Sequence, residues 1–140
     1  MCIRDSHNMD TLCSIEDNQL HIYPSVYELI HSDNNDRKNS MVINHILEKL
    51  DSLLEFQPLI EFHVHTGKMG IGQLSKYKTV ANLFIQVVSV KYSTDMLDKC
   101  YFYDVNMTMK VLLDMLKPIL PSVVKERIVI VKETEDDKDC

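Results

Sequence analysis

The sequence predicts a single α/β domain whose mostly parallel sheet is connected by crossover helices. The length of 140 residues, with 45% hydrophobic and 26% charged residues, fits one soluble globular domain. From residue 41 onward, segments with helical periodicity alternate three times with strand-like segments. This alternation indicates parallel strands joined by right-handed crossovers. The last strand-like segment is apolar almost throughout, which is typical of a strand buried on both faces.

The first forty residues carry few regular patterns. Residues 1–6, MCIRDS, lack the basic and apolar regions of a signal peptide and resemble a non-native leader, so they are left out of the fold. Residues 7–18 are polar, and we expect them to be unstructured. The segment 19–30, QLHIYPSVYELI, is expected to be partly a strand. The run 31–40 is rich in Asn, Asp and Ser and is expected to be a loop.

Two long helices are predicted from apolar residues at three- and four-residue steps. The first begins after Ser40, whose hydroxyl is suited to accept from a free backbone N–H as an N-cap, and it ends before Pro58. Its stripe comprises Val42, Ile43, Ile46, Leu47, Leu50, Leu53 and Leu54. The second spans about 73–91, with a stripe of Leu74, Tyr77, Val80, Ala81, Phe84, Val87 and Val88.

Three strands and a short helix complete the predicted elements. In the strand 60–65, Ile60, Phe62 and Val64 face one way and Glu61, His63 and His65 the other. A turn with Gly67, Gly70 and Gly72 follows it. The segment 99–105, aromatic and β-branched, is the second strand, and the segment 127–132 is the third. The helix 107–116 ends at Lys117–Pro118, because proline disfavours the α conformation of the residue before it.

His63 and His65 raise the question of a metal site, because residues two apart on a strand share a face. The segment FHVHT resembles the first metal-binding strand of the amidohydrolases and of the polymerase-and-histidinol-phosphatase superfamily. Those enzymes need further ligands at later strand ends of a longer barrel, and no histidine follows His65. A metal-dependent hydrolase using His63 and His65 is therefore the less favoured alternative, and no metal or cofactor is expected.

Other functional motifs are incomplete. The segment 66–72, TGKMGIG, has Met69 where a phosphate-binding loop needs Ser or Thr, and it lacks the third glycine of a dinucleotide site. The four cysteines form no CxxC pair and are expected to be reduced thiols. The net charge of −6, without a basic stripe, does not favour a nucleic-acid partner. No apolar run approaches the roughly 20 residues of a membrane span.

The most specific signal is an ordered set of motifs from residue 92 to residue 131. It comprises Tyr92 before Asp95, Lys99 leading into a strand, the K-P-x-L of Lys117, Pro118 and Leu120, and Arg127–Ile128 before the last strand. In this order the segment resembles the CRAL-TRIO lipid-binding family, which includes phosphatidylinositol/phosphatidylcholine transfer proteins and carriers of tocopherol and retinaldehyde. Residues 93–94 and 104–106 depart from the family's Tyr-Pro and Asn-Ala-Pro, and the upstream agreement is weaker.

The resemblance covers about residues 23–131 and implies a CRAL-TRIO-like fold that is incomplete at both ends. We therefore expect a partial CRAL-TRIO lipid-binding domain over residues 19–132, followed by an acidic tail at residues 133–140. The family's N-terminal helical module and its last segment have no counterpart here. A fragment of a longer protein is the favoured interpretation.

The resemblance implies a cytoplasmic, non-enzymatic protein that binds and transfers a phospholipid or another hydrophobic molecule, with transient contact with a membrane surface. A mobile gate over residues 108–120 would close the pocket, and the candidate pocket or gate residues are Met109, Leu112, Leu113, Leu116 and Leu120. Asp95 and Arg127 fall at the family's headgroup positions, where a carboxylate accepts from inositol hydroxyls and a guanidinium binds phosphate. The alternative is a protein-interaction module with a degenerate CRAL-TRIO fold and a filled pocket.

Overall fold

The structure, a computed structural model, describes residues 10–30, 32–67 and 71–131. In these ranges one sheet has the strand order β1-β2-β3-β4-β5. The strands are β1 (Cys13–Glu16), β2 (Gln19–Ile22), β3 (Ile60–His65), β4 (Leu97–Tyr103) and β5 (Ile128–Val131). β1 pairs antiparallel with β2, and every later pair is parallel. The predicted α/β fold with a mostly parallel sheet is confirmed.

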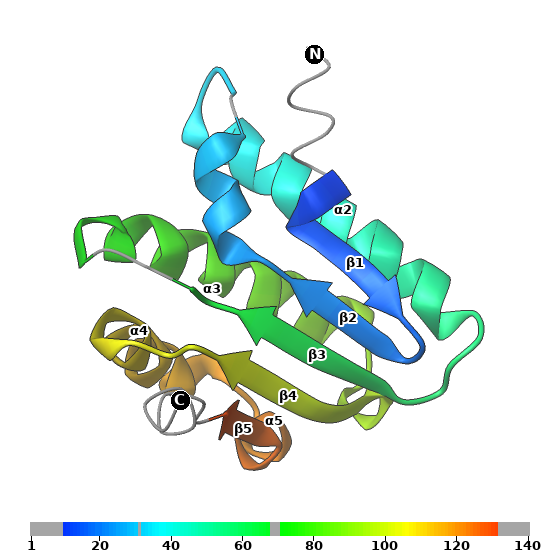
Figure 1. Ribbon diagram of the computed structural model, residues 1–140. Coiled ribbons are helices and arrows are strands. Elements are labelled where there is room, and N and C mark those ends of the chain that lie inside the picture. Colours follow the sequence, from blue (N-terminus) through cyan, green and yellow to red (C-terminus); the bar gives the residue numbers. More distant parts are fainter. Residues whose placement is uncertain (1–9, 31, 68–70, 132–140) are drawn as a thin grey trace, which may run out of the picture.

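The helices that connect the parallel strands share one side of the sheet. α2 (Asn35–Leu54) joins β2 to β3, and α3 (Leu74–Lys91) joins β3 to β4. α4 (Met107–Leu116) and α5 (Ser122–Glu126) join β4 to β5. Each parallel strand is added beside the preceding one, always in the same direction across the sheet. Because crossovers between parallel strands are right-handed, these helices lie on the same face. Figure 1 shows α2 and α3 behind the sheet, with the opposite sheet face toward the viewer.

Short 3₁₀ turns complete the connections. They are η1 (Pro24–Leu29), η2 (Ile71–Gln73), η3 (Thr94–Met96) and η4 (Lys117–Ile119). The hydrophobic core lies between the sheet and the helices, where Leu20 and Ile60 of the sheet are fully buried. The predicted stripe of α2 is also buried there, from Val42 to Leu53, with Leu54 half-buried. None of the described helices is long and apolar enough to cross a membrane.

Two predictions for the first forty residues are wrong. Residues 7–18 are not unstructured throughout, because residues 10–12 are helical and residues 13–16 form β1. The strand lacks an alternating pattern, since Cys13 is its one buried residue. The run 31–40 is not a loop throughout either, because α2 already begins at Asn35. Asn34, not Ser40, is the N-cap, and its Oδ1 accepts from the N–H of Arg37 at 2.8 Å.

Three boundaries or environments in the later part also differ from the prediction. β4 begins at Leu97 and ends at Tyr103, because Asp104 adopts a left-handed conformation with φ 57°. β5 is not buried on both faces: Ile130 is 43% exposed, because in the described part of the chain this strand pairs only with β4 and forms an edge. The predicted glycine turn falls partly on residues 68–70, which lie outside the described residues.

Candidate functional site

An apolar cavity of about 270 Å³ lies between the sheet and the helices. β2, β3, β4 and β5 supply its floor, and α2, α3 and α4 supply its walls. Its lining is apolar except for the hydroxyl groups of Ser89, Ser93, Thr94 and three tyrosines and the thiol of Cys100. A cavity with so few polar groups offers water few hydrogen-bond partners, and it therefore favours an apolar occupant.

α3 is a loosely packed wall of this cavity. Its inward residues Val80, Phe84 and Val88 are only half-buried, although they pack toward the core. The ring centroids of Phe84 and of Phe62 on β3 are 6.5 Å apart. The inward side chains keep accessible surface because the cavity lies beneath them. Atoms that face such a space lack dispersion contacts on that side, and an apolar ligand would supply those contacts.

The five candidate pocket residues from the sequence all line the cavity. Met109, Leu112, Leu113 and Leu116 are buried on α4, and Leu120 is half-buried after η4. The orientation of α4 is fixed at its N-terminus, where Oδ1 of Asn106 accepts from the N–H of Met109 at 2.9 Å. The structure therefore brings these residues together along one wall. Their contact with a ligand stays a prediction.

Neither candidate headgroup residue lines the cavity, but both adjoin lining residues at its serine and threonine end. The guanidinium of Arg127 donates to the carbonyl oxygen of Thr94 at 3.3 Å and to that of Leu97. These carbonyls flank Asp95, which is exposed and whose N–H donates to Oγ of Ser93 at 3.1 Å. Arg127 therefore holds η3 in place, and a role of either residue in headgroup binding stays a prediction.

The end of the cavity lined by Ser89, Ser93 and Thr94 is here called its mouth, because it carries the exposed residues. Ser89 and Ser93 line the cavity and are exposed, and Thr94 is half-buried. Tyr27 and Tyr77, which are both buried, line the part of the cavity near the start of α3, here called its closed end. The hydroxyl of Tyr27 donates to Oδ1 of Asn39 at 2.6 Å, and the hydroxyl of Tyr77 donates to the carbonyl of Pro24 at 3.5 Å. The cavity therefore has one end with exposed hydroxyl side chains and one end lined by buried tyrosines.

The ionisable groups that line the cavity stay neutral near pH 7. Burial raises the pKa of the Cys100 thiol to about 12, and burial raises the pKa of Tyr77 to about 12. Cys100 is a free thiol, as expected, and its raised pKa makes it a poor nucleophile. The cavity therefore presents an uncharged surface, which suits hydrocarbon better than a charged substrate.

A polar contact beside the mouth joins α3 to α2. The hydroxyl of Tyr92, a cavity-lining residue, donates to the carboxylate of Asp51, and Nζ of Lys91 lies 3.0 Å from Oδ2 of the same carboxylate. The hydrogen bond from Tyr92, followed by that from Lys91, lowers the pKa of Asp51 below its usual value. Sequence reasoning missed Asp51, because no local pattern signals a partner forty residues away.

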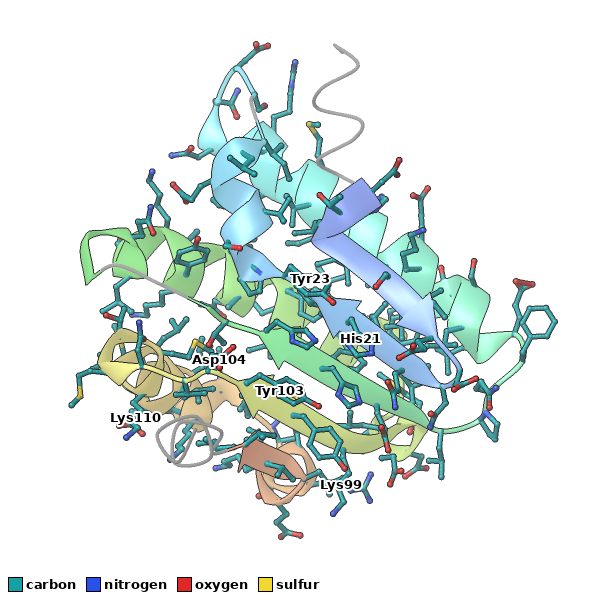
Figure 2. All side chains as sticks on the ribbon, viewed as in Figure 1. His21, Tyr23, Lys99, Tyr103, Asp104 and Lys110 are labelled. Carbon is teal, nitrogen blue, oxygen red and sulfur yellow. The ribbon has the colours of Figure 1, made fainter. Side chains whose placement is uncertain are left out.

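The face of the sheet turned away from the helices carries an ordered group of rings, here called the ring ladder: His21, Tyr23, His63, His65, Tyr101 and Tyr103. His21, His63 and Tyr101 are aligned across β2, β3 and β4, with neighbouring ring centroids 4.7 Å apart. In the next row, His65 stacks between Tyr23 at 4.6 Å and Tyr103 at 4.7 Å. Figure 2 shows His21, Tyr23 and Tyr103 on this open face.

Hydrogen bonds give the ladder histidines definite roles. Oε1 of Gln19 accepts from Nε2 of His21 at 2.8 Å, so Nδ1 of a neutral His21 accepts from Nε2 of His65 at 2.9 Å. Oε1 of Glu61 accepts from Nε2 of His63 at 2.9 Å, so Nδ1 of His63 accepts from the Tyr103 hydroxyl at 2.6 Å.

The metal alternative gains no support from this arrangement. Nδ1 of His63 and Nε2 of His65 are both engaged in hydrogen bonds to neighbouring side chains. Among the described residues, no group of three or more His, Cys, Asp and Glu side chains is placed to hold a metal ion. Sequence reasoning found His63 and His65 but missed His21, Tyr101 and Tyr103; a comparison of alternate positions in all the strands could have found them.

Comparison with known proteins identifies the fold. The family model for the CRAL/TRIO domain matches residues 40–139. The structure is similar to the crystal structure of Sfh5, with a TM-score of 0.70 and 11% sequence identity. The match covers 89% of this chain and 50% of the Sfh5 chain, so this chain spans about half the length of that protein. None of the curated proteins matches the sequence significantly.

Proposed function

The chain belongs to the CRAL/TRIO domain family, and from that premise we propose that it is a non-enzymatic carrier that binds a phospholipid or another hydrophobic molecule in its apolar cavity. The observation that carries this proposal is the hollow of about 270 Å³ beneath α3 and α4. Burial of a hydrocarbon chain there removes apolar surface from water, which favours binding at about 25 cal/mol per Å². The closed tyrosine end and the mouth would set the direction in which a bound amphiphile points.

A gate at residues 108–120 is part of this proposal, with transfer occurring during transient contact with a membrane surface in the cytoplasm. α4 has a second apolar stripe on its outer side, where Met107 is 73% exposed and Val111 and Met115 are also exposed. Lys110, exposed on the same helix, would face anionic headgroups (Figure 2). A helix that is apolar on both sides suits a gate, because it can cover the cavity and contact a bilayer.

Asp95 and Arg127 are the proposed headgroup contacts. Both lie beside the mouth, where the polar end of a bound amphiphile would emerge. Nη1 of Arg127 bonds to backbone carbonyls, and the remaining guanidinium N–H groups would serve an anionic headgroup. The runner-up function, a protein-interaction module with a degenerate fold, expects a filled cavity. The hollow therefore supports lipid binding over that alternative.

The test of the proposal combines lipid capture with lipid transfer. The purified chain is exposed to a cell-lipid extract, and the retained lipids are identified by mass spectrometry; transfer of a fluorescent lipid between vesicles is then measured. Val88→Phe places a ring in the cavity and is expected to reduce retention at least tenfold, whereas Val90→Phe changes a 90% exposed residue of the same helix and is expected to have no effect. Equal retention by the two variants would contradict binding in this cavity.

A further inference from the structure

We infer that the cavity takes a single-chain amphiphile whose hydrocarbon chain has about eleven carbon atoms, rather than the two chains of a membrane phospholipid. This inference rests on the proposed function and names the ligand class of the same site. It follows from the volume of the cavity, the length of its floor and the position of its polar residues.

The volume limits the amount of hydrocarbon. An apolar cavity of about 150 Å³ is enough for benzene, which has six carbon atoms. At the same packing, the cavity of about 270 Å³ holds about eleven carbon atoms. A phospholipid with two long acyl chains carries roughly three times as many carbons and would need roughly 800 Å³.

The length of the floor agrees with this number. The cavity extends along β4 from Leu97, at the mouth, to Phe102, toward the closed end. The five steps between consecutive residues from Leu97 to Phe102, at about 3.3 Å each, span roughly 16 Å. An extended chain of about eleven carbons, with bonds of about 1.5 Å in a zigzag, is roughly 13 Å long. One extended chain therefore fits the depth of the cavity as well as its volume.

The polar residues require a ligand with one small polar end. Ser89, Ser93 and Thr94 place hydroxyl groups at the mouth, whereas the lining beyond them is apolar up to the tyrosines. The tyrosine hydroxyls already donate to Asn39 and Pro24, so they offer little to a ligand head at the closed end. Hydroxyl side chains bind an alcohol or a carboxylate, and Arg127 nearby adds a positive charge that favours the carboxylate.

Calorimetric titration of the 140-residue chain with 1-alkanols and sodium alkanoates of about six to sixteen carbons tests the inference. Affinity should rise about fourfold per methylene while the added carbon is buried. The rise should stop near about eleven carbons, since later carbons would protrude from the mouth. A continued rise to sixteen carbons, or tighter binding of vesicle-supplied dioleoyl phosphatidylcholine than of dodecanoate, would overturn the single-chain assignment.

Two variants of α3 should shift, in opposite directions, the chain length at which ligand affinity stops rising. Ala81→Phe fills the part of the cavity beside Tyr77 and should shorten the best chain by roughly five carbons. Should that variant fail to fold, Phe84→Leu enlarges the cavity instead and should lengthen the best chain by roughly two carbons. Val90→Phe is the control and should leave the chain-length profile unchanged. An unchanged profile in the folded cavity variants would refute binding at this site.

The outcomes distinguish failure of the single-chain ligand from failure of the proposed lipid-carrier function. Binding of phospholipid without binding of any alkanol or alkanoate would refute the single-chain ligand and leave lipid carriage standing. Failure of single-chain ligands, phospholipid and an apolar dye alike would refute both.

Discussion

Hydrogen bonds between neighbouring strands join the side chains of the ring ladder. His65 on β3 donates to His21 on β2, and the acceptor nitrogen of His21 is available only while that ring is neutral. Burial, followed by the neighbouring histidines, lowers the pKa of His65, and Asp104 partly offsets this. Burial and then His63 lower the pKa of His21, and Glu16, 3.6 Å from its Nε2, partly offsets this. The folded protein therefore favours neutral rings.

We expect the free energy of unfolding to fall as the pH is lowered from about 6.5, the ordinary histidine pKa, toward the lowered values of the folded state. In that window the unfolded chain binds more protons than the folded chain, so acid favours unfolding. Urea unfolding between about pH 7.5 and pH 5.5 measures the effect. His65→Gln removes one of the two rings whose pKa is lowered, and it should flatten the profile. A free energy of unfolding that stays constant or rises on acidification would contradict the proposed hydrogen bond between neutral His21 and His65.

His63 illustrates what sequence can predict about a single residue. The alternation in residues 60–65 correctly predicts a strand with His63 on the face opposite Phe62. The same pattern says nothing of Tyr103, which lies forty residues later and donates to His63. Strand register depends on the packing of the whole sheet, so local sequence leaves these partners undetermined. The residue is only 5% exposed, although no helix covers its side of the described sheet.

At the scale of the element, α2 shows why helix centres are easier to predict than helix ends. Its apolar stripe begins at Val42, and the sequence therefore favoured a start after Ser40. The first turn, Asn35 to Lys38, is mostly exposed and polar, so periodicity does not reveal it. Several capping residues occur in succession before it, and only the structure identifies Asn34 as the one that accepts from Arg37.

Replacement of Asn34 should therefore reveal the true start of α2. Asn34→Ala removes the acceptor for the N–H of Arg37 and should lower the free energy of unfolding by about 1 kcal/mol. Ser40→Ala, at an exposed position inside the helix, should be neutral or slightly stabilising. Thermal and urea unfolding of both variants provide the comparison. A larger decrease in the free energy of unfolding for Ser40→Ala than for Asn34→Ala would support the helix start predicted from the sequence.

Arg127 connects two elements, because it begins the approach to β5 and holds the carbonyls of η3 and β4. Arg127→Lys keeps the charge but loses the planar arrangement of donors, and it should cost about 1 to 3 kcal/mol of stability. If Arg127 also contacts a headgroup, the lysine variant should retain binding of dodecanoate, whereas Arg127→Gln should weaken dodecanoate more than dodecanol. If Arg127→Gln lost the same affinity for dodecanoate and for dodecanol, the role of Arg127 would be purely structural.

At the scale of the molecule, the described part of the chain is a sheet with helices on one face and the ring ladder on the other (Figures 1 and 2). The alternation of helices and strands was sufficient to predict this α/β class, because crossover handedness restricts the topology. The cavity could not be predicted from periodicity, since the residues of α4 form the same apolar stripe whether they meet a filled or an unfilled space. Only the family resemblance pointed to a pocket.

The unequal packing of the two halves of the helical layer leads to a final prediction. Leu50 on α2 is fully buried and does not line the cavity, whereas Leu112 on α4 is 3% exposed and lines it. Leu50→Ala should cost about 3 to 5 kcal/mol because a new cavity forms in dense packing, and Leu112→Ala should fall near about 2 kcal/mol because fewer contacts are lost. At the same free concentration, dodecanoate should stabilise wild type and Leu50→Ala by the same amount, since Leu50 does not line the cavity and the affinity of the folded state is unchanged. In Leu112→Ala the wall has changed, so the added stabilisation should differ. If all three proteins gained equal stability, the ligand would have to bind away from α4.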